Sequence, residues 1–277
     1  MMKPLLKLEM TRAFYNKFFL FASLIGLILV VLQFVQVVLP LAAYLDYYRL
    51  YEPEGTYPLS VFNRWIGGES YSPYASIYTM LMPILTVLPF ADSYFTDRKN
   101  GMVKNILLRT KKKNYFISKY IAVFLSGGVV FTLPLLINFM LSAATLPSLL
   151  PEASTASFPI FETSMWSGLY YSQPYLYFLF YFLIDFVFAG LFPTIALAIT
   201  HFVENRFVVL LSPFLLNLFL TALLNFINAS KYSPNSFLNM SQPYMGIQFS
   251  YIVIEMLILF LVTASLFLGI GIREEVY

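Results

Sequence analysis

The sequence contains no cysteine and only one histidine, His201, among its 277 residues. Without cysteine there can be no disulfide, no thiolate metal ligand and no cysteine nucleophile. One histidine cannot supply a bis-histidine haem or a His-rich zinc site, and most histidine-dependent catalytic pairs are disfavoured as well. We therefore expect this chain to bind no cofactor and to have no enzymatic activity of its own.

Charged residues are also scarce. They make up 11% of the chain, whereas 59% of its residues are hydrophobic, and an average soluble domain carries about a quarter charged residues. The apolar residues come in blocks of about twenty or more, the length at which a helix crosses the hydrocarbon core of a bilayer. The composition therefore predicts an all-α membrane protein that forms a single transmembrane domain over residues 1–277.

Six apolar blocks predict six transmembrane helices, at about 18–39, 74–94, 120–146, 174–200, 207–227 and 247–272. The first block is longer than the roughly 7–15 apolar residues of a signal peptide and lacks a good cleavage site, so we expect it to be retained. Before it, within residues 1–17, Leu6, Met10, Ala13 and Phe14 share one face, which predicts an interfacial helix.

The distribution of positive charge predicts the topology. With six spans, all but three of the 17 Lys and Arg residues lie on the same side of the membrane as the N-terminus. The exceptions are Arg49, Arg64 and Lys231. The positive-inside rule therefore places both termini of this multi-pass protein in the cytoplasm. Because topology accounts for the net charge of +3, we expect membrane lipids and no nucleic acid as partners. Aromatic residues of the outer connections are expected to form an interfacial belt, namely Tyr44, Tyr47, Tyr48, Tyr51, Trp65, Tyr71, Trp166, Tyr170 and Tyr171.

The most informative segment is the cytoplasmic connection between the second and third predicted spans, residues 95–115. In it Val103, Ile106 and Leu107 share one face at the spacing i, i+3, i+4, which predicts a short amphipathic helix. Asp97 can lie near the start of this helix and a basic cluster follows its end, as the helix dipole favours. An apolar face on a cytosolic helix is expected to need a partner.

This connection resembles that of the permease subunits of type-2 ATP-binding-cassette transporters. In that family an acidic-basic pair is followed by a glycine, two apolar residues, a polar stretch and a lysine at the start of the next span. The chain has these features in order, as Asp97-Arg98, Gly101, Leu107-Leu108, Thr110 to Asn114 and Lys119. It departs from the family at Asp97, where glutamate is common, and at Met102, where a small hydroxyl residue is common.

The resemblance implies a coupling helix that docks into a groove on a separate ATPase. The residues assigned to this contact are Asp97, Arg98, Gly101, Val103, Ile106 and Leu107. Two permeases, identical or related, would join two cytosolic ATPases that bind ATP and Mg²⁺, since this chain lacks the G-x-x-x-x-G-K-[ST] motif. The implied function is export by alternating access in a bacterial cytoplasmic membrane. The alternative is that residues 97–113 form an ordinary positively charged loop.

Polar residues within the spans suggest a route for the substrate. Asn217, Thr221 and Asn225 repeat at i, i+4, i+8 on the fifth span, and Gln33 and Gln36 share a face of the first. The resemblance places the first, second and fifth spans along the route and the permease-permease interface. These five residues are therefore candidates for the translocation path, and interhelical hydrogen bonding without substrate contact is the alternative.

Three acids lie within the predicted spans: Asp92, Asp185 and Glu255. A charge near the middle of a span costs roughly 3 kcal/mol, so we expect Asp185 to be paired, protonated or exposed to water. As proton-relay sites, Asp185 and Glu255 would support an ion- or proton-coupled secondary transporter, which is the main alternative function. If Asp185 and Glu255 are instead structural partners of neighbouring polar residues, they do not support a secondary transporter.

Overall fold

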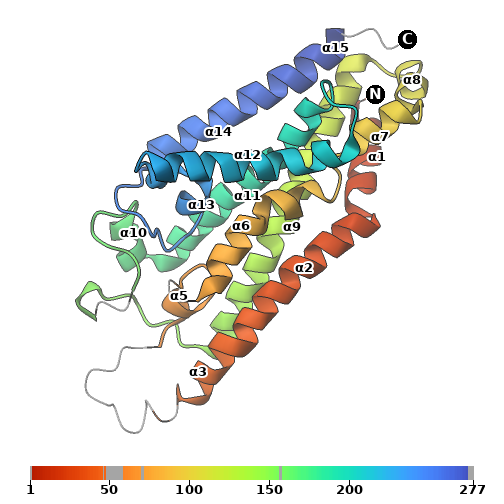
Figure 1. Ribbon diagram of the computed structural model, residues 1–277. Helices are drawn as coiled ribbons and strands as arrows, with labels where there is room; N and C mark the ends of the chain where they lie inside the picture. The colour runs from red at the N-terminus through yellow and green to blue at the C-terminus, as the bar shows by residue number, and fades with distance from the viewer. Residues whose placement is uncertain (1, 46, 48–58, 70–71, 156–157, 274–277) are drawn as a thin grey trace.

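The computed structural model describes residues 2–45, 47, 59–69, 72–155 and 158–273, and these form helices and connections without any strand (Figure 1). Five helices are long and apolar enough to cross a membrane, which confirms the prediction of a multi-pass, all-α membrane protein. Three of them are single α-helices: α9 (Lys112–Thr145), α11 (Pro174–Ile199) and α12 (Arg206–Phe226).

The first and the last long helices each contain a π-helical turn. The first is α2 (Lys17–Gln33), which continues through η1 (Phe34–Val38) into α3 (Leu39–Ala43). The last is α14 (Phe249–Ala264), which continues through η4 (Ser265–Ile270) into α15 (Gly271–Arg273). A π-helical turn widens the helix locally and is often found at functional sites.

The second predicted span, 74–94, is shorter than expected. Its helix α6 covers only Pro73–Val87, 15 residues, and so rises about 22 Å at 1.5 Å per residue, less than the roughly 30 Å hydrocarbon core. The chain then turns through 88–92 before α7 (Ser93–Lys99) begins. Pro89 explains the break, because it has no N–H to donate to the carbonyl of Leu85.

The centre of the bundle is the pair α9 and α11, the two most buried of the long helices. Glycines let their backbones approach closely. A Cβ atom on Gly127 would lie 2.6 Å from the ring of Pro193, and one on Gly190 would lie 2.7 Å from the carbonyl oxygen of Phe124. Around this pair, α2 lies on one side and α12 and α14 lie on the other (Figure 1).

The segments predicted to be cytoplasmic gather at one end of the bundle. There α1 (Met2–Phe14), α7, α8 (Met102–Leu107) and α15 lie together, while α3 and the short helices α5 (Val61–Arg64) and α10 (Ser167–Ser172) lie at the opposite end (Figure 1). Asn16 joins α1 to α2. Its Nδ2 donates to the carbonyls of Arg12 and Ala13 at 2.8 Å each, and its Oδ1 accepts from the N–H of Phe19 at 2.7 Å.

The aromatic residues of the opposite end do not all form an interfacial belt. Tyr44 is exposed, as a belt requires, but Trp65 and Tyr170 are fully buried. The Trp65 ring packs edge-on against the Phe178 ring at a centroid distance of 5.0 Å. The prediction is therefore wrong for Trp65 and Tyr170, because α5 packs against α9 and α10 packs against α11, and both side chains join the core of the bundle. Tyr48, Tyr51 and Tyr71 lie outside the described residues.

Candidate functional site

Four charged side chains from three helices meet at the end of the bundle that carries α7 and α8. Glu9 and Arg12 come from α1, Asp97 from α7 and Lys119 from α9. Lys119 Nζ lies 2.6 Å from Glu9 Oε2 and 2.7 Å from Asp97 Oδ2. Arg12 Nη2 lies 2.6 Å from Asp97 Oδ1, and Arg12 Nη1 lies 3.1 Å from Glu9 Oε1. We call these four residues the ion cluster.

The ion cluster contains two acids and two bases, and all but Arg12 are almost completely buried. Burial by itself would raise the pKa of Asp97, but the hydrogen bonds and positive charges of Arg12 and Lys119 outweigh it and hold that pKa below its usual value of 3.8. The hydroxyl of Tyr115 also donates to Asp97 Oδ2, at 3.2 Å. Asp97 is therefore ionised at neutral pH and ties α7 to both α1 and α9.

The structure corrects the predicted position of Asp97. The amphipathic helix is split at Gly101, which has a φ of +69°, so that Asp97 lies inside α7 and not near the start of α8. Lys119 lies two turns inside α9, since this helix begins at Lys112, earlier than the predicted 120. The roles of Glu9 and Arg12 were not predicted from the sequence, although a lysine close to an apolar span indicates that acidic partners lie nearby.

The apolar face of α8 is largely covered by this chain itself. Val103 is buried, and Ile106 and Leu107 are half-buried against the same core. The expectation that a separate partner covers this face is therefore wrong for Val103. The apolar side chain left open is that of Leu108, which is 85% exposed directly after α8. The other exposed residues between 98 and 109 are Arg98, Lys99, Asn100, Lys104, Asn105 and Arg109.

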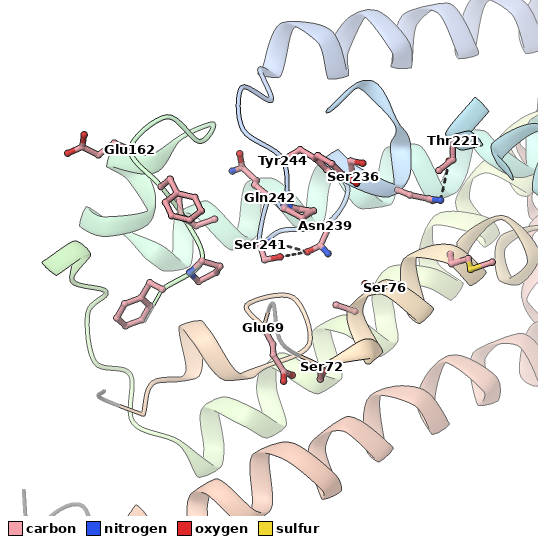
Figure 2. Close-up of a pocket in the computed structure, with 18 of the residues that line it drawn as sticks. Glu69, Ser72, Ser76, Glu162, Thr221, Ser236, Asn239, Ser241, Gln242 and Tyr244 are labelled. Atoms are coloured by element: carbon pink, nitrogen blue, oxygen red, sulfur yellow. Dashed lines mark hydrogen bonds between the residues drawn. The ribbon is translucent and has the colours of Figure 1, made fainter. Parts of the chain in front are cut away.

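At the opposite end, a cavity of about 940 Å³ opens between α6, α12 and the outer connections (Figure 2). Figure 2 shows Glu69, Ser72 and Ser76 on one side, facing the connection after α13 (Pro234–Phe237) on the other. The described lining contains two acids, Glu69 and Glu162, together with many neutral polar side chains, and no Lys, Arg or His. We call it the outer cavity.

Two of the five predicted path residues line the outer cavity. They are Thr221 and Asn225 of α12. Thr221 Oγ1 lies 3.0 Å from Ser233 Oγ and accepts a hydrogen bond of 3.2 Å from Asn235 Nδ2. Asn217, one turn further into the membrane, donates to Asn235 Oδ1 at 3.0 Å. The polar stripe on α12 is thus held by residues at and just before the start of α13.

The remaining two predicted path residues, Gln33 and Gln36, are like Asn217 absent from the lining of this cavity. Gln33 is fully buried, donates to Glu69 Oε2 at 3.1 Å and accepts from Asn138 Nδ2 at 2.9 Å. Gln36 accepts a hydrogen bond from the hydroxyl of Tyr74. Gln33 therefore joins α2 to its neighbours and also positions a carboxylate of the outer cavity, while Gln36 joins η1 to α6. The structure does not bring the glutamines and the α12 stripe together.

The three acids of the predicted spans have different surroundings. Asp92 pairs with Arg206 at 2.5 Å and so connects the turn after α6 to the start of α12. Asp185 is buried in α11, and its Oδ1 has no hydrogen-bond partner among the described residues. Asp185 and Glu255 line different cavities. Within the described part of the chain, no three His, Asp or Glu side chains are grouped to hold a metal ion.

Together, the five long apolar helices and their connections define a multi-pass helical membrane protein. No model of a known protein family matches the sequence, and no curated protein sequence matches it.

Proposed function

We propose that this chain is the permease subunit of a type-2 ATP-binding-cassette exporter, with six spans and both termini in the cytoplasm. In this proposal α6 and the turn that follows it form the second span. The observation that carries the proposal is the ion cluster, which fixes the α7–α8 segment to the first residues of the third span and to α1. A short helix held in this way can pass a force applied from the cytosol directly to the membrane helices.

The proposed docking surface is the exposed side of α7 and α8, centred on Leu108. An exposed leucine in a segment that also exposes Lys104 and Arg109 offers one apolar anchor with basic side chains close in the sequence. A partner groove that is apolar with an acidic edge would complement it. Val103 takes a different role from the one first expected. It anchors α8 to the core, so that α8 moves together with α9.

In the proposed transport cycle, closure of two partner ATPases on ATP and Mg²⁺ moves α8, and the ion cluster transmits this motion to α1 and α9. The outer cavity would be the exit end of the route, because α6 and α12 line it and Thr221 and Asn225 face it. A second permease, identical or related, would pack against an exposed apolar face of this chain, with lipid covering the remainder. The large exposed side chains of α2 and α12 provide such faces.

Co-purification from native membranes tests this proposal. We expect an ATPase with the G-x-x-x-x-G-K-[ST] motif to co-purify with the wild-type chain, and mass spectrometry would identify it. Leu108→Glu should abolish the association, because it places a charge at the centre of the surface, and Leu108→Met should retain it. Both variants should fold, since Leu108 is 85% exposed.

Two results would count against the proposal. One is equal recovery of the ATPase with Leu108→Glu and with the wild-type chain. The other is substrate transport by the purified chain reconstituted without any ATPase, which would favour the alternative of an ion- or proton-coupled secondary transporter.

A further inference from the structure

A smaller cavity of about 310 Å³ lies between α11, α12 and α14, separate from the outer cavity and the ion cluster. Its volume is at the lower end of the roughly 300–1,000 Å³ typical of ligand pockets. Its described lining is apolar, with residues such as Phe192, Leu220 and Ile258, except at two positions. These are Asn217 of α12 and Glu255 of α14. We call this cavity the α12–α14 groove.

Both polar residues of the α12–α14 groove have a buried oxygen atom without a hydrogen-bond partner. Asn217 is only 2% exposed, and its Nδ2 is used in the hydrogen bond to Asn235, which leaves Oδ1 free. Glu255 has an unpartnered Oε2. Buried acceptors are paired in almost all proteins, because an unpaired one loses its hydrogen bonds to water and gains nothing in return.

The chemistry of the groove defines what could satisfy these atoms. The two unpartnered oxygens are both acceptors, and one of them belongs to the carboxyl group of Glu255. The described lining contains no Lys, Arg, His, Ser, Thr or Tyr that could donate to them. The missing group is therefore a donor, and a positive charge would complement Glu255. The rest of the wall can only contact apolar atoms.

We propose that the α12–α14 groove binds an amphiphile that presents an N–H-bearing ammonium group to Glu255 and Asn217 and lays an apolar body against the three helices. A primary ammonium has three donors, enough for both oxygens. Asn217 lies in the middle of α12 and Glu255 lies six residues into α14, so the ammonium is held below the surface of the membrane. This inference does not depend on the proposed function.

The test uses the full-length protein in phosphatidylcholine nanodiscs and a photoactivatable diazirine derivative of dodecylamine. Labelled peptides are identified by mass spectrometry. Labelling is expected on α11, α12 and α14, with competition by dodecylamine but not by dodecanol or dodecyltrimethylammonium, which lacks N–H donors. Glu255→Gln should reduce the labelling at least about tenfold, which corresponds to about 1.4 kcal/mol, and Asn217→Leu should reduce it by a smaller factor. Glu204→Gln, at an exposed acid outside the groove, should leave it unchanged.

An additional competitor identifies the natural source of the ammonium group. Competition by phosphatidylethanolamine would identify a membrane lipid, and competition by dodecylamine without it would identify a free lipophilic amine. The inference would be overturned if Glu255→Gln labelled as strongly as the wild-type protein while remaining monodisperse. It would also be overturned if dodecanol or the trimethylammonium compound competed as well as dodecylamine.

Discussion

At the scale of single residues, Lys119 illustrates how a charge inside an apolar helix constrains its surroundings. Its ammonium is fully buried and contacts carboxylates that lie 110 and 22 residues away in the sequence. A buried charge is tolerated when it is paired and hydrogen-bonded, and removal of one partner leaves the others uncompensated. Loss of a single member of the ion cluster should therefore destabilise the protein, because the remaining buried charges are no longer balanced.

The first prediction concerns this sensitivity. Lys119→Met keeps the side-chain length but removes one of the two cations that Glu9 and Asp97 share, and only Arg12 then remains. It should therefore destabilise the protein by about 3–5 kcal/mol. Lys113→Met, at an exposed position near the start of the same helix, should have little effect. Thermal unfolding in detergent measures both. Equal midpoints for the two variants would show that the ion cluster adds nothing to stability.

The second prediction follows from the depressed pKa of Asp97. Because the folded protein holds this pKa below 3.8, the stabilisation from the ionised carboxylate is fully present above the pKa of the unfolded chain and is lost as the pH falls through the folded value. The contribution of Asp97 should therefore be constant from pH 7 to about 5 and disappear only in acid below about pH 3.8. Asp97→Asn should remove that acid-dependent component from a plot of unfolding midpoint against pH. A loss of the Asp97 contribution already between pH 7 and 6 would contradict this.

The sequence could single out some members of the ion cluster but not its connections. Asp97 and Lys119 were recognised because they belong to one local motif. Glu9 and Arg12 belong to the predicted interfacial helix, residues 1–17, yet their partners lie 110 and 85 residues further along the chain. Periodicity indicates which face of a helix is polar, but it does not predict which charged residues of other helices will contact that face.

At the scale of elements, the junction between α7 and α8 sets the direction of α8 and so of the proposed docking surface. Gly101 has a φ of +69°, and a Cβ atom there would meet nothing within 4 Å. The position therefore requires glycine for its backbone conformation and not for space.

The third prediction uses this distinction. Gly101→Ala should cost about 1–2 kcal/mol, the penalty for an L-residue in the left-handed region, and should reduce coupling to the ATPase by reorienting α8. Gly101→Asn should be tolerated better, because asparagine adopts this conformation more readily. ATP-dependent transport by membrane vesicles measures the coupling. Equal transport by both variants and the wild-type protein would show that the turn has no such role.

The helices themselves were largely predictable, since hydropathy and length determine which segments can cross a membrane. Five predicted spans correspond to long apolar helices. The second does not, because its apolar residues continue through Pro89 although the hydrogen-bond ladder cannot. A span is predicted from the mean hydropathy of a window of residues, and this mean does not reveal a single break in the helix such as the one at Pro89.

At the scale of the whole molecule, the gathering of α1, α7, α8 and α15 at one end agrees with the distribution of positive charge (Figure 1). The cavities at the other end and between the helices could not be predicted, because their walls combine side chains from segments far apart in the sequence.

The fourth prediction tests the orientation of the molecule. Since the natural chain has no cysteine, Leu108→Cys and Phe161→Cys each introduce a single thiol at an exposed position. A membrane-impermeant maleimide added to intact cells should label Phe161→Cys and not Leu108→Cys, and it should label both after the cells are opened. Labelling of Leu108→Cys in intact cells would place α8 outside and contradict the proposed topology.

The proposed function requires that the segment after α8 contact a separate ATPase. The most direct measurement is cross-linking from the single thiol of Leu108→Cys in native membranes, with Phe161→Cys as the control from the opposite end. We expect a cross-linked product between Leu108→Cys and a protein with the G-x-x-x-x-G-K-[ST] motif, and none from the control. If Leu108→Cys forms no such product in membranes where the protein is transporting its substrate, the claim is contradicted.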